Sequence, residues 1–199
     1  MYSKLVEFIR ARIMISQEEL EKSFSYTQPK TFIKGEYLLR IGEYCRFIGF
    51  LNSGLIITTI IDNAGNEKAS NFIYEGSFFT YAEGIASNTP SYKNFIALED
   101  CETIMLSKEN LAIIFKENPK FETLLTQMLA EEVRNLLLNE QASKTLSLDE
   151  RYLNIEKKYP NAFQRIPMKY LADYLGIEAP SLSRLRKRLA GKKKLTWVK

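Results

Sequence analysis

The residues whose types and spacing indicate chemistry lie near the C-terminal end of the chain, where basic side chains gather. After Glu178 the sequence contains no further acidic residue. Guanidinium and ammonium groups at this density are typical of a surface that contacts nucleic-acid phosphates. The basic residues of this stretch are Arg184, Arg186, Lys187, Arg188, Lys192, Lys193, Lys194 and Lys199.

The charge of the chain is unevenly distributed, which strengthens this interpretation. Residues 145–199 hold 13 Lys and Arg against 5 Asp and Glu, whereas the whole chain holds 28 against 24. The preceding residues are therefore net acidic, as in an ordinary soluble domain. A charge difference between parts of a chain indicates nucleic-acid binding. The alternative is a solvated basic face without a partner.

The apolar pattern around Gly176 predicts two short helices joined by a turn, the second of them amphipathic. Its leucines recur at i, i+3 and i+7, and a stripe of Ser and Arg runs parallel, displaced by about 100°. A helix with an apolar inner face and a Ser/Arg outer face suits the major groove of DNA. The inner stripe is Leu182, Leu185 and Leu189; the outer stripe is Ser181, Arg184 and Arg188.

Upstream of this motif, the sequence contains two helix-starting motifs and a region rich in short strands. Ser16–Glu19 and Ser147–Glu150 each have the Ser-x-x-Glu spacing that begins a helix. Between about residue 30 and residue 106, short β-rich runs alternate with glycine-containing turns. The predicted strands are 37–39, 47–51, 55–61, 95–98 and 103–106. This alternation predicts a β-sandwich, a jelly roll or a small barrel.

A single long helix is predicted from Pro119 to about Ser143, because apolar residues recur there at intervals of three and four. A helix of ~25 residues is ~37 Å long, more than a small domain needs for its own core. Part of its apolar stripe is therefore expected to pair with a second copy of the chain, although packing on the β domain is the alternative. The residues expected to face the second copy are Phe121, Leu125, Met128, Leu129 and Leu136.

Composition argues against several other classes of protein. The 199 residues include no histidine, which removes the usual imidazole metal ligands and the Ser-His or Cys-His nucleophile pairs. Cys45 and Cys101 are isolated, so they cannot supply the four thiolates of an iron–sulfur cluster. We therefore expect no catalytic residues, no metal and no cofactor. Without a run of ~20 apolar residues, no membrane span is expected and the cytoplasm is the predicted compartment.

The order of these elements, together with several motifs, resembles the Crp/Fnr superfamily of bacterial transcription regulators over essentially the whole chain. The strongest match is the stretch 171–184, which is similar to the turn and recognition helix of that family. The other matching stretches are 34–42, 72–78, 97–102 and Arg151-Tyr152.

The resemblance implies an α+β fold with three parts. These are an N-terminal β-roll or jelly roll of the cyclic-nucleotide-binding type with N-terminal helices (1–116), a long dimerisation helix (117–144) and a helix-turn-helix domain of the winged-helix type (145–199). The tail from Leu195 to Lys199 is short for a full wing and is expected to form a single strand or to fray.

The family's ligand-binding positions depart from the cyclic-nucleotide pattern. Thr80-Tyr81 stands where the family has the Gly-Glu pair for the ribose, and Ser91-Tyr92 where it has the Arg-Ser pair for the phosphate. Lys93 is not a bidentate donor, so cyclic AMP binding of the usual kind is not expected. The pocket is either empty or takes another effector. The candidate pocket residues are Thr80, Tyr81, Ser91, Tyr92, Lys93 and Asn94.

The resemblance also implies how this chain would contact DNA. Arg184 matches a family arginine that contacts bases and can bind guanine O6 and N7. Ala179 and Pro180 replace polar residues of other members, so the target site does not transfer. The remaining predicted contacts, mainly to phosphate, are Ser181, Ser183, Arg186, Lys187, Arg188, Lys192 and Lys193.

The function expected on these grounds is a homodimeric, sequence-specific DNA-binding regulator that acts on a pseudo-palindromic site. Double-stranded DNA is the expected partner, RNA polymerase a further candidate partner, and any small-molecule effector is unidentified. The alternative is a small-molecule-binding β-roll protein whose basic C-terminal part mediates protein contacts. An enzyme on the β domain ranks third.

Overall fold

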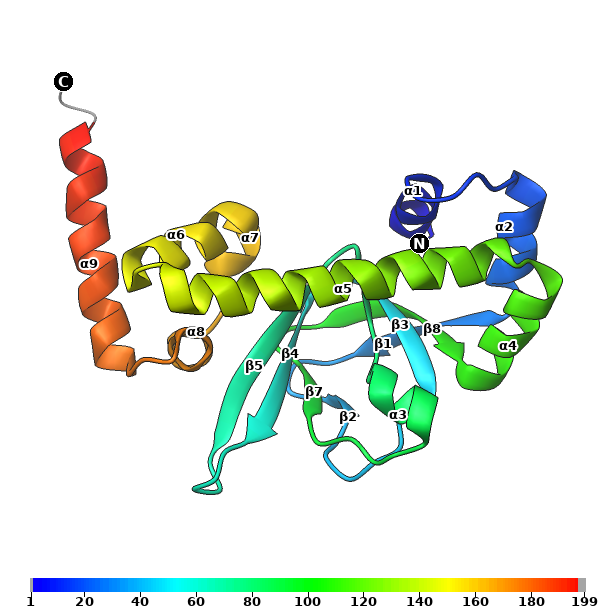
Figure 1. The fold of residues 1–199 in the computed structure, drawn as a ribbon, viewed down its shortest axis with the longest axis horizontal. Helices are drawn as coiled ribbons and strands as arrows, with labels where there is room; N and C mark the ends of the chain where they lie inside the picture. The colour runs from blue at the N-terminus through cyan, green and yellow to red at the C-terminus, as the bar shows by residue number, and fades with distance from the viewer. Residues whose placement is uncertain (1, 197–199) are drawn as a thin grey trace. The chain divides into compact units, whose positions relative to one another are not determined.

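The computed structural model describes residues 2–196, and for 161–162 and 191–196 it describes the backbone only. Its contacts divide the chain into two compact units (Figure 1). The first unit is Met1–Ile60 with Asn71–Arg134, and the second is Ile61–Ser70 with Asn135–Lys199. Compact units are defined by contacts and not by function, so the three functional parts expected from the sequence stay a prediction.

Two antiparallel four-stranded sheets form the β-roll. One sheet has the order β1-β8-β3-β6 and the other the order β2-β7-β4-β5. The strands are β1 (Thr27–Phe32), β2 (Tyr37–Leu39), β3 (Phe47–Ser53), β4 (Leu55–Ile61), β5 (Glu67–Tyr74), β6 (Ser77–Phe79), β7 (Asn94–Ala97) and β8 (Cys101–Ser107). The predicted β-rich domain is confirmed, with strand β4 matching its predicted run at both ends.

Strand β1 was not among the predicted strands, and its position in the sheet explains why. It lies at the edge of its sheet, paired with β8 alone, and four of its six residues are exposed. Pro29 pairs with Ile104 within this strand. Proline is tolerated at a sheet edge because the missing N–H would otherwise face solvent. An exposed edge strand with a proline lacks the apolar alternation that identifies a strand in a sequence.

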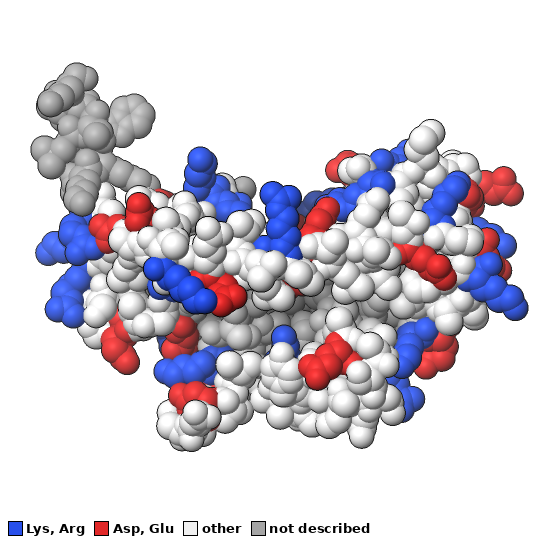
Figure 2. Space-filling view, viewed as in Figure 1, with Lys and Arg blue, Asp and Glu red and all other residues white. Residues whose placement is uncertain are grey.

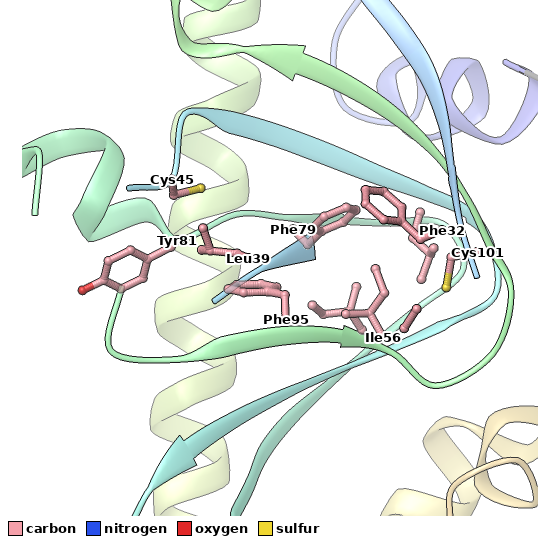
Figure 3. Close-up of a cluster of buried hydrophobic side chains, with 11 residues drawn as sticks. Phe32, Leu39, Cys45, Ile56, Phe79, Tyr81, Phe95 and Cys101 are labelled. Carbon is pink, nitrogen blue, oxygen red and sulfur yellow. The ribbon is translucent and has the colours of Figure 1, made fainter. Parts of the chain in front are cut away.

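The space inside the β-roll is filled by apolar side chains, which Figure 3 shows pointing inward from several strands. The ring centroid of Phe79 lies 6.0 Å from that of Phe47 and 6.3 Å from that of Phe95. Gly49 makes this possible, since a Cβ at that position would lie 2.2 Å from the Phe79 ring. The buried members of the cluster are Phe32, Leu39, Cys45, Leu51, Ile56, Ile73, Phe79, Tyr81, Phe95, Ala97 and Cys101.

The helices of the first unit are α1 (Ser3–Arg10), α2 (Gln17–Phe24), α3 (Ala82–Ser87), α4 (Lys108–Glu117) and the beginning of α5 (Lys120–Thr145). Helix α2 begins with the predicted capping box, in which Ser16 and Glu19 each bond the other's backbone N–H. A second apolar cluster joins α1, α2 and α5 to the sheet. Its buried residues are Leu5, Ile9, Leu20, Phe50, Ile104 and Leu124.

The C-terminal helices are α6 (Leu148–Lys158), α7 (Pro160–Phe163), α8 (Met168–Leu175) and α9 (Ala179–Thr196). The second predicted capping box, Ser147 with Glu150, begins α6. Helix α9 continues through Leu195 and Thr196, so of the two alternatives expected for the tail, a single strand is not formed by these two residues. Trp197, Val198 and Lys199 lie outside the described residues. Among residues 2–196, no helix is both long enough and apolar enough to cross a bilayer.

Candidate nucleic-acid interface

The turn between α8 and α9 depends on a glycine in the left-handed region. Gly176 has a φ of 70° and caps α8. The next residue closes the turn, because the backbone N–H of Ile177 donates to the Ala172 carbonyl at 3.0 Å. A side chain at the glycine position would strain the backbone even though space is available. The predicted helix-turn-helix geometry therefore rests on this position.

A small apolar core holds the two helices of the motif together. Leu171, Ala172 and Leu175 are buried on α8, and they face the leucine stripe of α9. The stripe is buried as its i, i+3, i+7 spacing predicts, and it comprises Leu182, Leu185 and Leu189. Ala172 has no side chain beyond Cβ, which lets helices pack closely. Burying one face of α9 fixes which side chains its other face presents.

The opposite face of α9 presents Arg184 and Ser181 close to the beginning of the helix. Arg184 is exposed, and its Nη2 lies 3.2 Å from Ser181 Oγ. A guanidinium held by an exposed hydroxyl can exchange this bond for a base or a phosphate at little cost, since water already competes for it. Pro180 is the second residue of α9, where a missing N–H removes no helical bond.

Arg186 and Arg188 have partners within the same unit. The Nε atom of Arg186 donates to the Tyr152 hydroxyl at 3.1 Å, and its guanidinium carbon lies 5.3 Å from the centroid of the Phe163 ring. Arg188 is ion-paired with Asp149 at the beginning of α6. Both side chains were expected to contact phosphate. Through these contacts Arg186 also holds α9 on α6 and α7, and the phosphate contacts of both arginines stay a prediction.

The other predicted DNA-contacting residues are distributed along α9. Ser183 and Lys187 are exposed and Ala179 is half-buried, whereas the side chains of Lys192 and Lys193 lie outside the described residues. Figure 2 shows Lys and Arg interspersed with Asp and Glu over most of the visible face, with basic side chains at the edge where Figure 1 draws α9. The exposed candidates nearest the turn are thus Ser183, Arg184 and Lys187, whereas Ser181 is half-buried.

Two positioning residues were not among the predicted site residues. Arg151 donates from Nη2 to the carbonyl oxygen of Leu175 at 3.1 Å, which satisfies a free carbonyl at the end of α8. Tyr152 packs edge-on against Phe163, with ring centroids 4.8 Å apart, and receives Arg186. The sequence signal was the Arg151-Tyr152 pair itself, which entered the resemblance without an assigned role.

The polar groups at the predicted effector positions are bonded within the β-roll itself. Thr80 Oγ1 donates to the Phe47 carbonyl at 2.7 Å, and Ser91 Oγ donates to the Lys93 carbonyl at 2.7 Å. Asn94 donates to Thr59 Oγ1 at 3.2 Å and accepts from the backbone N–H of Ile41 at 2.8 Å. The polar groups of Thr80, Ser91 and Asn94, which would otherwise be available to a ligand, therefore stabilise the β-roll.

The remaining effector candidates form a small aromatic group. The Tyr81 ring is buried, its hydroxyl donates to Glu83 at 2.9 Å, and Figure 3 shows this hydroxyl pointing away from the core cluster. Burial, and then the Glu83 carboxylate, raise the pKa of Tyr81. Tyr92 packs edge-on at 5.4 Å and is exposed, with the Lys93 ammonium 5.0 Å from its ring centroid. The structure thus brings Tyr81, Tyr92 and Lys93 together at the surface of the roll.

The predicted dimer helix divides into two parts by burial. Phe121, Leu125 and Met128 are half-buried against the apolar cluster of their own unit or its cavity. Leu129 and Leu136 are exposed, as are other apolar residues of the same stretch, namely Val133, Leu137 and Leu138. The first part of the stripe therefore packs against its own chain, and the second part is exposed to solvent.

Comparison with known proteins supports the same arrangement. Residues 29–118 match the family model of the cyclic nucleotide-binding domain. FixK2 of Bradyrhizobium japonicum is similar in structure with a TM-score of 0.72 and 15% identity, covering 84% of this chain and 86% of its own. The c-di-GMP-responsive global regulator CLP of Xanthomonas campestris is similar with a TM-score of 0.68 and 15% identity, covering 89% and 93%.

A third similar structure is a protein of Eubacterium rectale assigned to the Crp/Fnr family as a transcriptional regulator. It has a TM-score of 0.69 and 14% identity, with 89% of this chain and 85% of that chain covered. No curated protein sequence matches this chain. Residues 29–118 therefore match the cyclic nucleotide-binding domain, and the chain as a whole has a fold similar to that of these regulators.

Proposed function

We propose that this protein is a sequence-specific DNA-binding transcription regulator. The observation that carries the proposal is the division of α9 into a buried leucine face and an exposed face bearing Ser181 and Arg184. A recognition helix needs both features, because the buried face fixes the rotation at which the other face enters the major groove. Arg184 is assigned to base contact, and Ser181 and Lys187 to phosphate.

The proposed active form is a homodimer that pairs through the second part of α5. Leu136 and Leu137 are 58% and 61% exposed, and Val133 is 56% exposed. Exposed leucines at helical spacing are costly in water and are covered when two helices pair. A two-fold dimer would place its recognition helices on half-sites ~34 Å apart, one turn of DNA. RNA polymerase remains a predicted partner.

In this proposal the interior of the β-roll serves structure and needs no bound ligand. Phe79 and Phe95 fill the interior, and Thr80, Ser91 and Asn94 use their polar groups on protein partners. A nucleotide would have to displace the aromatic rings and break these hydrogen bonds. Ligand-free protein is therefore expected to bind DNA.

Selection of binding duplexes from a random DNA library tests this proposal with the ligand-free full chain. The wild type should enrich a two-fold-symmetric site. Arg184→Ala should weaken binding to that site by ~1–3 kcal/mol and relax base choice at one position in each half-site. Arg46→Ala is the matched control, since it removes an exposed arginine of the first unit and should change neither affinity nor base preference.

A salt titration separates DNA binding from the alternative of a β-roll protein with a basic protein-binding tail. Several phosphate contacts require log affinity to fall steeply and linearly with log salt concentration. Failure of the wild type to enrich any sequence, together with a flat salt dependence, would overturn the proposal. Equal base preferences of wild type and Arg184→Ala would remove Arg184 from its assigned role.

A further inference from the structure

A cavity of about 80 Å³ lies outside the β-roll interior, within the first unit. Its walls come from α1, α2, α4, the first turns of α5 and the strands β1, β3, β6 and β8. Ile104 and Ile114 are buried wall residues, and Leu124 closes the wall on α5. This space is separate from the positions where the family binds nucleotides, since none of the residues 80–94 lines it.

The chemistry of the walls excludes polar occupants. Ser23 and Thr27 contribute the hydroxyl groups among the lining side chains, and both already donate to backbone carbonyls, of Leu20 at 2.7 Å and of Phe24 at 2.8 Å. A water molecule needs two to four polar partners to be stable in a cavity. Apolar cavities that offer no such partners stay dry and accept apolar molecules.

Several wall residues are only half-buried, which distinguishes this space from a sealed packing defect. Phe24, Phe115 and Phe121 retain solvent exposure while lining the cavity, as do Leu111 and Leu125. Large apolar side chains at the rim can change rotamer without unfolding the core on which they pack. They provide an entry path for a small molecule.

We propose that this cavity is a binding site for a compact apolar molecule, a hydrocarbon of about six carbon atoms or fewer. The size limit follows from comparison with an apolar cavity of about 150 Å³ that holds benzene, because the present cavity is smaller and a ligand of that size would require its half-buried rim side chains to change rotamer. Phe121, Leu124 and Met128 make one wall of the site part of α5. A bound molecule therefore adds contacts to the beginning of the helix whose later part is proposed to pair.

The test is a titration of the full-length, methyl-labelled protein with benzene and, separately, with dissolved xenon, followed by methyl NMR. Saturable shifts are expected for Ile9, Ile104 and Ile114 in the cavity wall. Ile56 and Ile73, inside the β-roll, should not shift. Saturable shifts confined to the β-roll methyls, or none at all, would overturn the proposal. DNA binding is not part of this readout, so the result is independent of the proposed function.

Two adjacent isoleucines supply a matched pair of variants on α4. Ile114→Phe fills the cavity, whereas Ile113→Phe makes the same change at an exposed position that does not line it. Ile114→Phe should weaken benzene and xenon binding at least tenfold, and Ile113→Phe should leave it unchanged. Where Ile114→Phe fails to fold, as judged by circular dichroism, Leu111→Phe fills the same cavity from its rim. Equal binding by the filled and control variants would place the ligand elsewhere and reject the site.

Discussion

The polar groups of the β-roll and those on the outer face of α9 differ in their hydrogen-bond partners. At the predicted effector positions, Thr80, Ser91 and Asn94 are bonded to protein groups around an aromatic core. On α9, Ser181 and Arg184 are joined only weakly to each other near the surface, at 3.2 Å. Polar groups that are bonded inside a protein contribute stability, and exposed ones can be exchanged for a partner. The difference supports the proposal that recognition lies on α9.

The contrast extends to two arginines of α9 that are two residues apart and therefore point to different sides of the helix. Arg184 is exposed, whereas Arg186 is half-buried against Tyr152 and Phe163. Both belong to one basic run in the sequence. Basic side chains of one run can therefore differ in role: Arg184 is free to serve the proposed DNA contact, whereas Arg186 holds α9 on its neighbouring helices.

The largest expected effect on stability comes from removing an aromatic side chain from the interior of the β-roll. Phe79→Ala should lower the free energy of unfolding by about 3–5 kcal/mol, because it removes a ring packed against Gly49 and leaves a cavity. Chemical denaturation followed by circular dichroism measures this. Phe79→Leu retains most of the volume and should cost less. A loss below about 1 kcal/mol for the alanine variant would show that the interior is not packed as described.

A smaller effect is expected at the turn that positions the recognition face. Gly176→Ala should destabilise the C-terminal unit by about 1–2 kcal/mol, since a φ of 70° is unfavourable for a residue with a Cβ. Thermal unfolding monitored in that unit, together with DNA affinity, measures the loss. Gly176→Asn is the control, because asparagine tolerates this conformation better. Equal losses for both variants would point to a cause other than backbone strain.

Arg186→Ala sharpens the comparison between neighbouring arginines. It should cost about 1 kcal/mol of stability through the lost hydrogen bond to Tyr152 and the lost contact with Phe163. Base preference in the library selection should not change. Arg184→Ala should show the reverse, with unchanged stability and altered base preference. A change of base preference in Arg186→Ala would assign that side chain to the DNA interface.

The smallest effect concerns the capping box of α2 and its pH dependence. The Lys120 ammonium, 2.7 Å from Glu19, and the Ser16 backbone N–H lower the pKa of Glu19 to about 2. The folded pKa lies below the unfolded value near 4.5, so the stabilisation is present above that pH and is lost as the pH falls toward 2.

Comparison of thermal midpoints of wild type and Glu19→Gln between pH 6 and pH 2 checks this prediction. The wild type should be more stable at pH 6, and the difference should shrink as Glu19 protonates. In the capping box of α6, the pKa of Glu150 is lowered by hydrogen bonds with Ser147 and not by a neighbouring cation. Glu150→Gln should therefore show a weaker pH dependence. A difference that stays constant with pH would contradict the role of the Glu19 charge.

Sequence reasoning predicted those elements whose signals are local and failed where the environment decides. Both capping boxes, the long helix and strand β4 follow from spacing within a few residues. Strand β1 was not predicted, because at the edge of a sheet it can contain Pro29 and does not need alternating apolar and polar residues. For the tail, the sequence left a single strand and fraying as alternatives, whereas Leu195 and Thr196 continue helix α9.

The sequence by itself determined the order of the elements, the amphipathic division of α9 and the absence of histidine chemistry, because periodicity and composition are properties of neighbouring residues. Only the tertiary structure decided which basic side chains have partners within the protein and whether the interior of the β-roll is filled. Arg186 meets Tyr152 from another helix, and Phe79 meets Gly49 from another strand. Such contacts join residues that are distant along the chain, and a sequence pattern carries no information about their distance in space.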